Sequence, residues 1–420
     1  MSKPKPAVPI IYRHREQRRR ERLRGFNPGV RDAIAELTCC SQEAEDLADS
    51  FPGLLYALVT GFGTPSAREA CFNHVLEGKS LRLAAAALGL PYWTRRLPPQ
   101  AFSEPLCNLP SSADFDSRIS HLIPSSRILV RPWLDRILCA YHVCGEEFAI
   151  WVGRNLRLPL PEATDESFTF LTAWAWHSIT LEAPGHALLN RPWTSKMSLR
   201  RAEEEVVKWR RRLSLSYSLG NGLPNAWLNA GVVGEFEFVP LLTAQDFIRE
   251  SEAMDNCLDQ YSDRMASGGI RVFSIRREGV PVADIELGPI ARQSHLPTIV
   301  QIKAARNRPA PLAVWRAAHA WLKGHGDVPL PRRPGALKIG ERRQAMRRIW
   351  VPYFAHLPER MLPSLAALLA REPLVRQSSR RLLPSDCWLF PDRFLPIGTD
   401  PVSPAPATAF TDDGDVSGTS

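Results

Sequence analysis

The stretch that decides the fold runs from Leu241 to Leu322 and begins LLTAQDFIRESEAMDNCLDQYSDRMASGGIRVFSIRREGVPVADIELGP. Its first part predicts a helix. Thr243 and Asp246 have the spacing of a capping box, and apolar residues then recur at helical spacing as far as Met265. The pair Gly268-Gly269 predicts the end of that helix, because glycine adopts the left-handed backbone conformation at little cost.

Three short strands are predicted after this helix. Apolar and polar residues alternate in Val272–Arg276, Val282–Leu287 and Ile299–Ala304, which is the period of a strand with one buried face. In the third strand, Val300 is expected to share the apolar side with Ile302. A second amphipathic helix closes the stretch. Short connections favour antiparallel strands covered by helices, so the class is α+β: a mostly helical chain with one small antiparallel sheet in the order helix-β-β-β-helix.

The same stretch carries a resemblance to a known family. The residues that carry it are Met254, Cys257, Tyr261, Gly268, Phe273-Ser274-Ile275, Val282-Ala283, Glu286-Leu287, Gln301 and Asn307. Over about residues 241–322 the sequence resembles the PcfJ-like domain family, which is associated with conjugative plasmids and other bacterial mobile elements. The family has no settled biochemical activity. Its members typically have one or two histidines before the cysteine, where this sequence has Asp255 and Asn256.

Four polar residues of the predicted sheet are candidates for catalysis. Asp284 and Glu286 share one face of the second strand, and Gln301 and Lys303 share one face of the third. Carboxylate and amide oxygens can hold Mg²⁺, and a lysine can stabilise a phosphorane. The pattern resembles a degenerate PD-(D/E)xK nuclease core, with Glu252 as the acid of the preceding helix. Two other interpretations stay open: a nucleic-acid contact surface and an ordinary salt-bridged, solvent-facing surface.

Cys257 and His177 are two further candidates for chemistry. Cys257 could be a nucleophile, but its acidic neighbours oppose thiolate formation. Its position between Met254 and Tyr261 favours a buried core cysteine. His177 lies among tryptophans, and we expect it to be packed beside them rather than to act as a catalyst.

Charge points to a polyanionic partner. The formal net charge is +9 and the isoelectric point is about 9.3, values that favour nucleic acid. Two arginine-rich segments are candidate phosphate contacts: Arg13, Arg15, Arg18, Arg19, Arg20, Arg22 and Arg24, and Arg342, Arg343, Arg347 and Arg348. The alternative for the first segment is a solvated, disordered leader. Residues 79–97 resemble half of a helix-turn-helix, but their prolines leave the second helix short, so plain helix packing is favoured.

Composition divides the chain into six predicted segments. They are a basic disordered tail (1–28), a helical domain (29–161), a helical segment (165–225), the PcfJ-like α+β domain (226–325), a basic helical segment (326–395) and a disordered acidic, proline-rich tail (396–420). No apolar run approaches the ~20 residues of a membrane span. We therefore expect no membrane partner. The eight cysteines show no metal-ligand spacing, so we expect a reduced, cytoplasmic chain with no metal site. No cofactor is predicted.

The sequence therefore favours a non-catalytic accessory protein of a plasmid or mobile genetic element. Its arginine-rich surfaces would hold DNA or RNA, while the α+β domain binds a partner protein. One alternative is a divergent Mg²⁺-dependent nuclease acting at the face around Asp284. The other is a protein-interaction module without a nucleic-acid role.

Overall fold

The computed structural model describes residues 17, 21–156, 163–261, 264–265, 269–289, 296–326 and 339–357, with residues 163–166, 339, 340, 342 and 343 described by their backbone alone. Within these residues the α+β class is confirmed, because the chain is mostly helical and contains one six-stranded antiparallel sheet. The predictions for residues 1–16, for Arg18, Arg19 and Arg20, for Gly268 and for residues 358–420 lie outside the described residues.

The N-terminal part is helical. Its helices are α2 (Pro28–Thr38), α3 (Gln42–Ser50), α4 (Pro52–Val59), α5 (Pro65–Leu76), α6 (Leu81–Leu88), α7 (Ala113–Ile119), α8 (Arg127–Cys144) and α9 (Glu146–Asn155). Many begin at a capping side chain: Ser41, Thr64 and Ser80 each accept a hydrogen bond from a backbone N–H of the first turn, which satisfies a donor that has no partner within the helix.

Residues 79–97 do not form a helix-turn-helix, in agreement with the favoured prediction of plain helix packing. After α6, the chain makes two 3-10 turns, η1 (Tyr92–Arg96) and η2 (Pro99–Ala101). Trp93 of η1 is buried and its indole N–H donates to the Pro110 carbonyl at 3.0 Å. Residues 79–97 therefore serve helix packing, as the prolines indicated.

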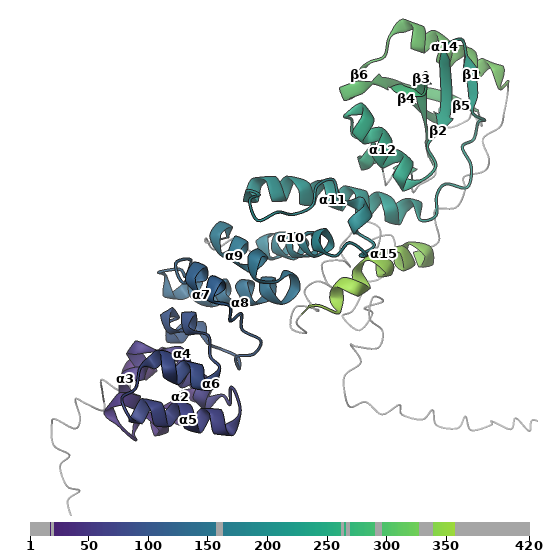
Figure 1. The fold of residues 1–420 in the computed structure, drawn as a ribbon. Helices are drawn as coiled ribbons and strands as arrows, with labels where there is room; N and C mark the ends of the chain where they lie inside the picture. The colour runs from purple at the N-terminus through teal and green to yellow at the C-terminus, as the bar shows by residue number, and fades with distance from the viewer. Residues whose placement is uncertain are drawn as a thin grey trace, which may run out of the picture.

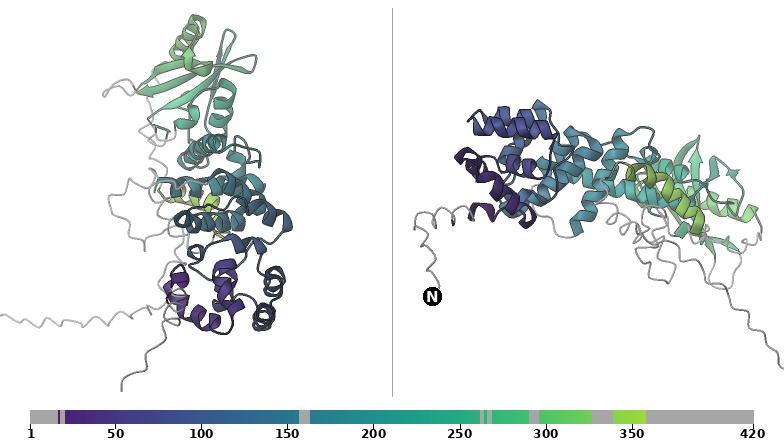
Figure 2. Two further views of the ribbon diagram at one scale, coloured as in Figure 1. Left: turned by 90° about the vertical axis from the view of Figure 1, so that its left-hand side faces the viewer. Right: turned by 90° about the horizontal axis from the view of Figure 1, so that it is seen from below.

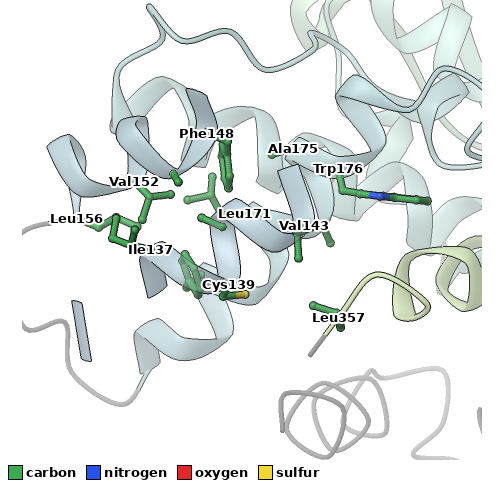
Figure 3. Close-up of a cluster of buried hydrophobic side chains, with 14 of the residues drawn as sticks. Ile137, Cys139, Val143, Phe148, Val152, Leu156, Leu171, Ala175, Trp176 and Leu357 are labelled. Carbon is green, nitrogen blue, oxygen red and sulfur yellow. The ribbon is translucent and has the colours of Figure 1, made fainter. Parts of the chain in front are cut away.

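The middle of the molecule is a second helical layer (Figures 1 and 2). It contains α10 (Ala163–Ile179), the 3-10 turn η3 (His186–Leu188), α11 (Leu199–Leu219) and α15 (Ile339–Phe354), which returns from late in the chain. Apolar side chains of α8, α9 and α10 form a shared core, together with Leu357 beyond α15 (Figure 3). This core joins the N-terminal helices to the later ones.

His177 is packed among aromatic rings, as predicted. It is fully buried, and Trp176, Trp209 and Tyr353 contact its ring. Burial, and to a lesser extent the nearby His186, lower the pKa of His177 to about 3. The imidazole is therefore neutral at physiological pH and part of the core.

The sheet is a meander in which each strand pairs with the next. The strands are β1 (Gly231–Val233), β2 (Phe236–Pro240), β3 (Arg271–Arg277), β4 (Val280–Pro289), β5 (Pro297–Ala304) and β6 (Arg308–Pro309). The three predicted strands are β3, β4 and β5. On one face, α14 (Leu312–Gly324) completes an apolar core in which Trp321 stacks on Phe238 at 4.6 Å. On the other face lies α12 (Ala244–Met254), as Figure 1 shows.

The predicted long helix from Thr243 to Gly268 is wrong beyond Met254. The capping box of Thr243 and Asp246 is present, but Asp255 adopts the left-handed conformation, with φ 48°. The Ser251 hydroxyl donates to the Asn256 carbonyl, and the Asn256 side chain accepts the Leu258 N–H. These local bonds replace helical ones, and the chain continues as a 3-10 turn, η4 (Leu258–Gln260).

Val300 does not share a side with Ile302. A bulge lies between Glu286 and Leu287, so that Leu287 pairs with Ile299 while Glu286 pairs with Gln301. The extra residue is Val300, which is 49% exposed, whereas Ile302 is buried. A bulge inserts one unpaired residue and reverses the alternation beyond it.

None of the described helices combines the length and apolarity needed to cross a membrane.

Candidate functional site

The four polar residues predicted on the sheet do lie together. Asp284 of β4 is directly opposite Lys303 of β5, and Glu286 is opposite Gln301. The two acids do not face solvent, however, because Asp284 is only 6% and Glu286 only 3% exposed. Helix α12 packs on β4, and Asn256 and Arg264, which follow it, bond to the two acids. The interpretation of this face as a solvent-facing surface is therefore wrong for both carboxylates.

Glu286 is held by three neighbours. The Arg264 guanidinium donates to both of its carboxylate oxygens, with one bond of 3.0 Å. Gln301 donates from Nε2 to Glu286 Oε2 at 2.7 Å and also lies 2.7 Å from the Tyr261 hydroxyl. Burial, and then the negative charge of Glu286, raise the pKa of Tyr261 to about 12. Both oxygens of Glu286 are therefore already hydrogen-bonded.

Asp284 is paired with an acid of α12 that the sequence interpretation missed. Burial first, and then the charge and hydrogen bond of Glu250, raise the pKa of Asp284 to about 8. The Asn256 amide donates to Asp284 Oδ2 at 2.6 Å and opposes that rise. Two buried carboxyl groups in contact cannot both ionise readily. Asp284 therefore carries a proton at neutral pH.

The acid of α12 that lies beside Asp284 is Glu250, and not Glu252 as predicted. Glu250 is 2% exposed and accepts a 2.7 Å hydrogen bond from the Ser274 hydroxyl, with Arg276 3.6 Å away. Glu252 instead has a half-exposed side chain and pairs with Arg212. The signal was present in the sequence, because Glu250 lies three residues after Phe247 on the buried stripe of the helix.

A small pocket opens beside these acids. It has about 20 Å³ of space, room for about one water molecule. The lining residues are Asn256, Cys257, Leu258, Tyr261, Val272, Asp284, Glu286, Gln301, Lys303 and Asn307. Five residues that carry the family resemblance therefore meet here: Cys257, Tyr261, Glu286, Gln301 and Asn307. Met254 is buried instead and does not line the pocket.

Cys257 is not the buried core cysteine that its spacing predicted. It is partly exposed, and its Sγ lies 3.7 Å from the Asn307 amide nitrogen. The prediction failed because α12 ends three residues earlier, so Cys257 leaves the apolar stripe. The rim of the pocket has unusual backbone: Arg306 and Asn307 both have positive φ, at 59° and 57°, which is uncommon outside glycine.

The acids of this pocket do not supply a metal-binding set. Mg²⁺ is held by carboxylates together with other oxygen ligands. Here Glu286 is engaged by Arg264 and Gln301, and Asp284 is protonated. Among the residues that the structure describes, no three Asp, Glu, His or Cys side chains are grouped to hold a metal ion. The geometry therefore gives no support to the nuclease alternative at this face.

The arginines of the N-terminal half surround a different feature. Two adjoining hollows share Arg95 and Arg96, which end η1. The first has a volume of about 620 Å³ and is lined also by Arg82, Tyr92 and His121. The second has a volume of about 450 Å³ and its lining includes three further arginines. We call this feature the arginine cleft and define it by Arg22, Arg24, Arg82, Arg95, Arg96 and Arg127.

Several of these guanidinium groups are held in place. Arg95 donates to the Ser50 carbonyl at 3.2 Å and to the Tyr92 hydroxyl, and Arg96 donates to the Ser120 carbonyl at 3.1 Å. Arg82 and Arg95 both lie over the Tyr92 ring, with 5.0 and 5.6 Å from guanidinium carbon to ring centroid. The acids of the cleft are fewer: Asp116 lines the first hollow, and Glu21 and Asp49 line the second.

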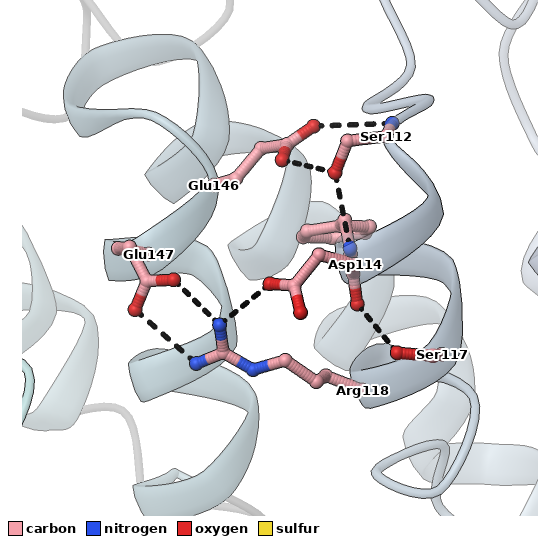
Figure 4. Close-up of polar contacts among 7 residues, drawn as sticks. Ser112, Asp114, Ser117, Arg118, Glu146 and Glu147 are labelled. Carbon is pink, nitrogen blue, oxygen red and sulfur yellow. Dashed lines mark hydrogen bonds and ion pairs between the residues drawn. The ribbon is translucent and has the colours of Figure 1, made fainter.

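The wall formed by α7 is fixed to α9 by polar contacts (Figure 4). Arg118 bonds to Asp114 of its own helix and to Glu147 of α9. Ser112 caps α7 and donates to Glu146. These bonds hold the helix that carries Ser117 into the cleft.

Of the predicted nucleic-acid contacts, Arg22 and Arg24 lie in the cleft, and Arg22 is paired with Asp49 at 3.0 Å. Arg347 and Arg348 are exposed on α15, whereas the side chains of Arg342 and Arg343 lie outside the described residues. The sequence interpretation missed Arg82, Arg95, Arg96 and Arg127, because these arginines are scattered along the chain and form no run.

One family model matches part of this chain. Residues 199–312 match the family model described as PcfJ-like protein. The matched segment takes in α11, the six strands and α12, and so contains the pocket beside Asp284 but not the arginine cleft. The matched segment begins before residue 241, where the resemblance noted in the sequence begins, and it covers only a part of the chain. No curated protein and no solved structure matches the chain.

Proposed function

We propose that this protein binds nucleic acid through phosphate contacts in the arginine cleft. The observation that carries the proposal is the convergence of six arginines on two adjoining hollows of about 620 and 450 Å³. The planar guanidinium group suits phosphate geometry and always carries its charge. Several of these groups are held by backbone carbonyls and by Tyr92, so little side-chain entropy is lost when a phosphate binds.

The role we assign is non-catalytic. The 3-10 turn η1 is too short to read bases in a major groove. The contacts are therefore to the phosphate backbone of the nucleic acid and are largely independent of its base sequence. On the family resemblance, we assign the protein to the accessory proteins of plasmids or other mobile genetic elements. The PcfJ-like segment is separate from the cleft and would engage a partner protein.

A triple variant tests the cleft. Arg24, Arg82 and Arg127 are exposed, and within the described part of the chain none of them has a carboxylate partner, so their removal leaves the fold intact. Arg24→Ala/Arg82→Ala/Arg127→Ala is expected to weaken binding to a labelled oligonucleotide. Each lost phosphate contact lowers the steepness of the log–log salt dependence by about 0.7–0.9.

Arg347→Ala/Arg348→Ala on α15 is the matched control and should bind as the wild type does. If the α15 variant loses affinity while the triple variant does not, the phosphate contacts lie on α15 and the cleft is not the site. If the wild type itself does not bind, the interaction-module alternative is supported.

A further inference from the structure

We propose that the arginine cleft takes single-stranded nucleic acid, with an unpaired base beside Tyr92 and the phosphates along the arginines. This inference rests on the proposed function and names the form of nucleic acid that the cleft binds. The two hollows of the cleft differ in their linings. Five arginines line the second hollow, whereas the first has three arginines together with Tyr92, Asp116 and Ser117. The first hollow is therefore suited to a base and the second to phosphates.

Tyr92 and two arginines form a stacking surface on the wall of the first hollow. The guanidinium carbons of Arg82 and Arg95 lie 5.0 and 5.6 Å from the Tyr92 ring centroid, and both arginines are exposed. The buried Phe51 contacts the Tyr92 ring edge-on at 5.9 Å and so holds it against the core. Unpaired bases stack on aromatic rings and on guanidinium planes. A stacked arginine still presents its N–H groups at the edge of that plane, where a phosphate can accept them.

The acids of the cleft separate the place of the base from the place of the phosphates. Asp116 lines the first hollow, and no lysine or arginine of the described residues forms an ion pair with it. A carboxylate without a counter-charge repels a phosphate but can accept hydrogen bonds from an uncharged base, as can the Ser117 hydroxyl. In the second hollow, Asp49 is paired with Arg22 at 3.0 Å, and Glu21 is the other acid among five arginines. Phosphates are therefore favoured there.

A duplex cannot make the same contacts. Its bases are paired and stacked inside the double helix, and turning one outward costs free energy. The first hollow, at about 620 Å³, has the volume of a small-molecule pocket, so it accommodates a base with its sugar. Phosphate contacts alone would favour the duplex, which carries one charge per ~1.7 Å of its axis against ~3.4 Å for one of its strands. A preference for the single strand therefore reports a contact with the base.

The experiment compares three labelled oligonucleotides by fluorescence anisotropy with the full-length protein at one salt concentration. They are a single strand, the same strand with abasic sites in place of its central nucleotides, and the duplex of that sequence. The natural strand is expected to bind about tenfold more tightly than the abasic strand, because stacking of a base is lost. The salt dependence of these two strands should be equal, because their phosphates are the same. Equal affinity for the natural and abasic strands, or tighter binding of the duplex, would overturn the inference.

Two variants of Tyr92 assign the base contact to its ring. Tyr92→Leu should lower the affinity for the natural strand about tenfold and bring it to that of the abasic strand, while duplex binding is retained. Tyr92→Phe keeps the ring, loses only the hydrogen bond from Arg95 and should keep the preference for the natural strand. If Tyr92→Leu weakens all three oligonucleotides equally, the ring only positions the arginines and the base assignment is wrong.

The triple arginine variant separates this inference from the proposed function. If that variant weakens all three oligonucleotides while the wild type binds natural and abasic strands equally, the cleft is a phosphate site and only the base contact is refuted. If that variant binds as the wild type does, the cleft is not the phosphate site and the proposed function fails instead. Weaker binding of the variant, together with the tenfold preference of the wild type for the natural strand, supports both.

Discussion

Replacing Trp350 with alanine is expected to lower the free energy of unfolding by about 3–5 kcal/mol. Trp350 of α15 is fully buried, with Phe170 and Trp209 each 5.9 Å away between ring centroids. Its indole N–H donates to the Tyr217 hydroxyl at 2.6 Å. The substitution removes these contacts and leaves a cavity between α15, α10 and α11. Urea unfolding followed by circular dichroism measures the loss.

Trp350→Phe is the control for this effect. It keeps an aromatic ring in the core but removes the hydrogen bond to Tyr217, so its cost should be smaller, about 1–2 kcal/mol. A loss below about 1 kcal/mol in the alanine variant would contradict the packing of α15 on α10 and α11. The last described helix would then not be packed into the rest of the helical core.

Stability is expected to fall as the pH rises towards 8, because of Asp284. The pKa of Asp284 is raised from its usual 3.8 to about 8 in the folded protein. Between these values the folded chain keeps a proton that the unfolded chain releases. The stabilisation is therefore complete below about pH 4 and is lost as the pH rises through about 8. Its size is several kcal/mol. Urea midpoints measured across this range report the slope.

Asp284→Asn isolates this contribution from other titrating groups. The groups that face Asp284 are Glu250 of α12, Asn256 after it, Ser274 of β3 and Lys303 of β5. An amide cannot ionise and can donate to the Glu250 carboxylate at every pH. The variant should lose most of the slope and match or exceed the wild type in stability near pH 8. Equal pH dependence in the two proteins would show that Asp284 is not protonated in the fold.

Local patterns predicted local structure well. The spacing of Thr243 and Asp246 predicted the start of α12, and alternation predicted which residues of β3 and β4 face the apolar core. The end of α12 was not predictable from periodicity, because the apolar residues keep helical spacing beyond it. The helix stops through bonds of Ser251 and Asn256 with nearby backbone groups, which a hydrophobic pattern does not register.

The candidate sites depend on long-range contacts, and these limited prediction. Alternation assigned Asp284 and Glu286 to one face, but it could not say what covers that face. The cover comes from α12 and the residues after it, and it changes both acids from solvated groups to buried ones. The arginine cleft has the same origin: arginines from 22 to 127 meet only after the helices pack. The run of arginines in residues 13–24 predicted phosphate contacts in the N-terminal tail instead.

The salt dependence of nucleic-acid binding tests the central claim most directly. Fluorescence anisotropy of labelled single-stranded and duplex oligonucleotides would be measured over a range of salt concentrations. Phosphate contacts from all six arginines of the cleft predict a linear log–log plot with a slope of about −4 for single strands and about −5 for duplex. Absence of binding at low salt, or binding that does not change with salt, would contradict the account.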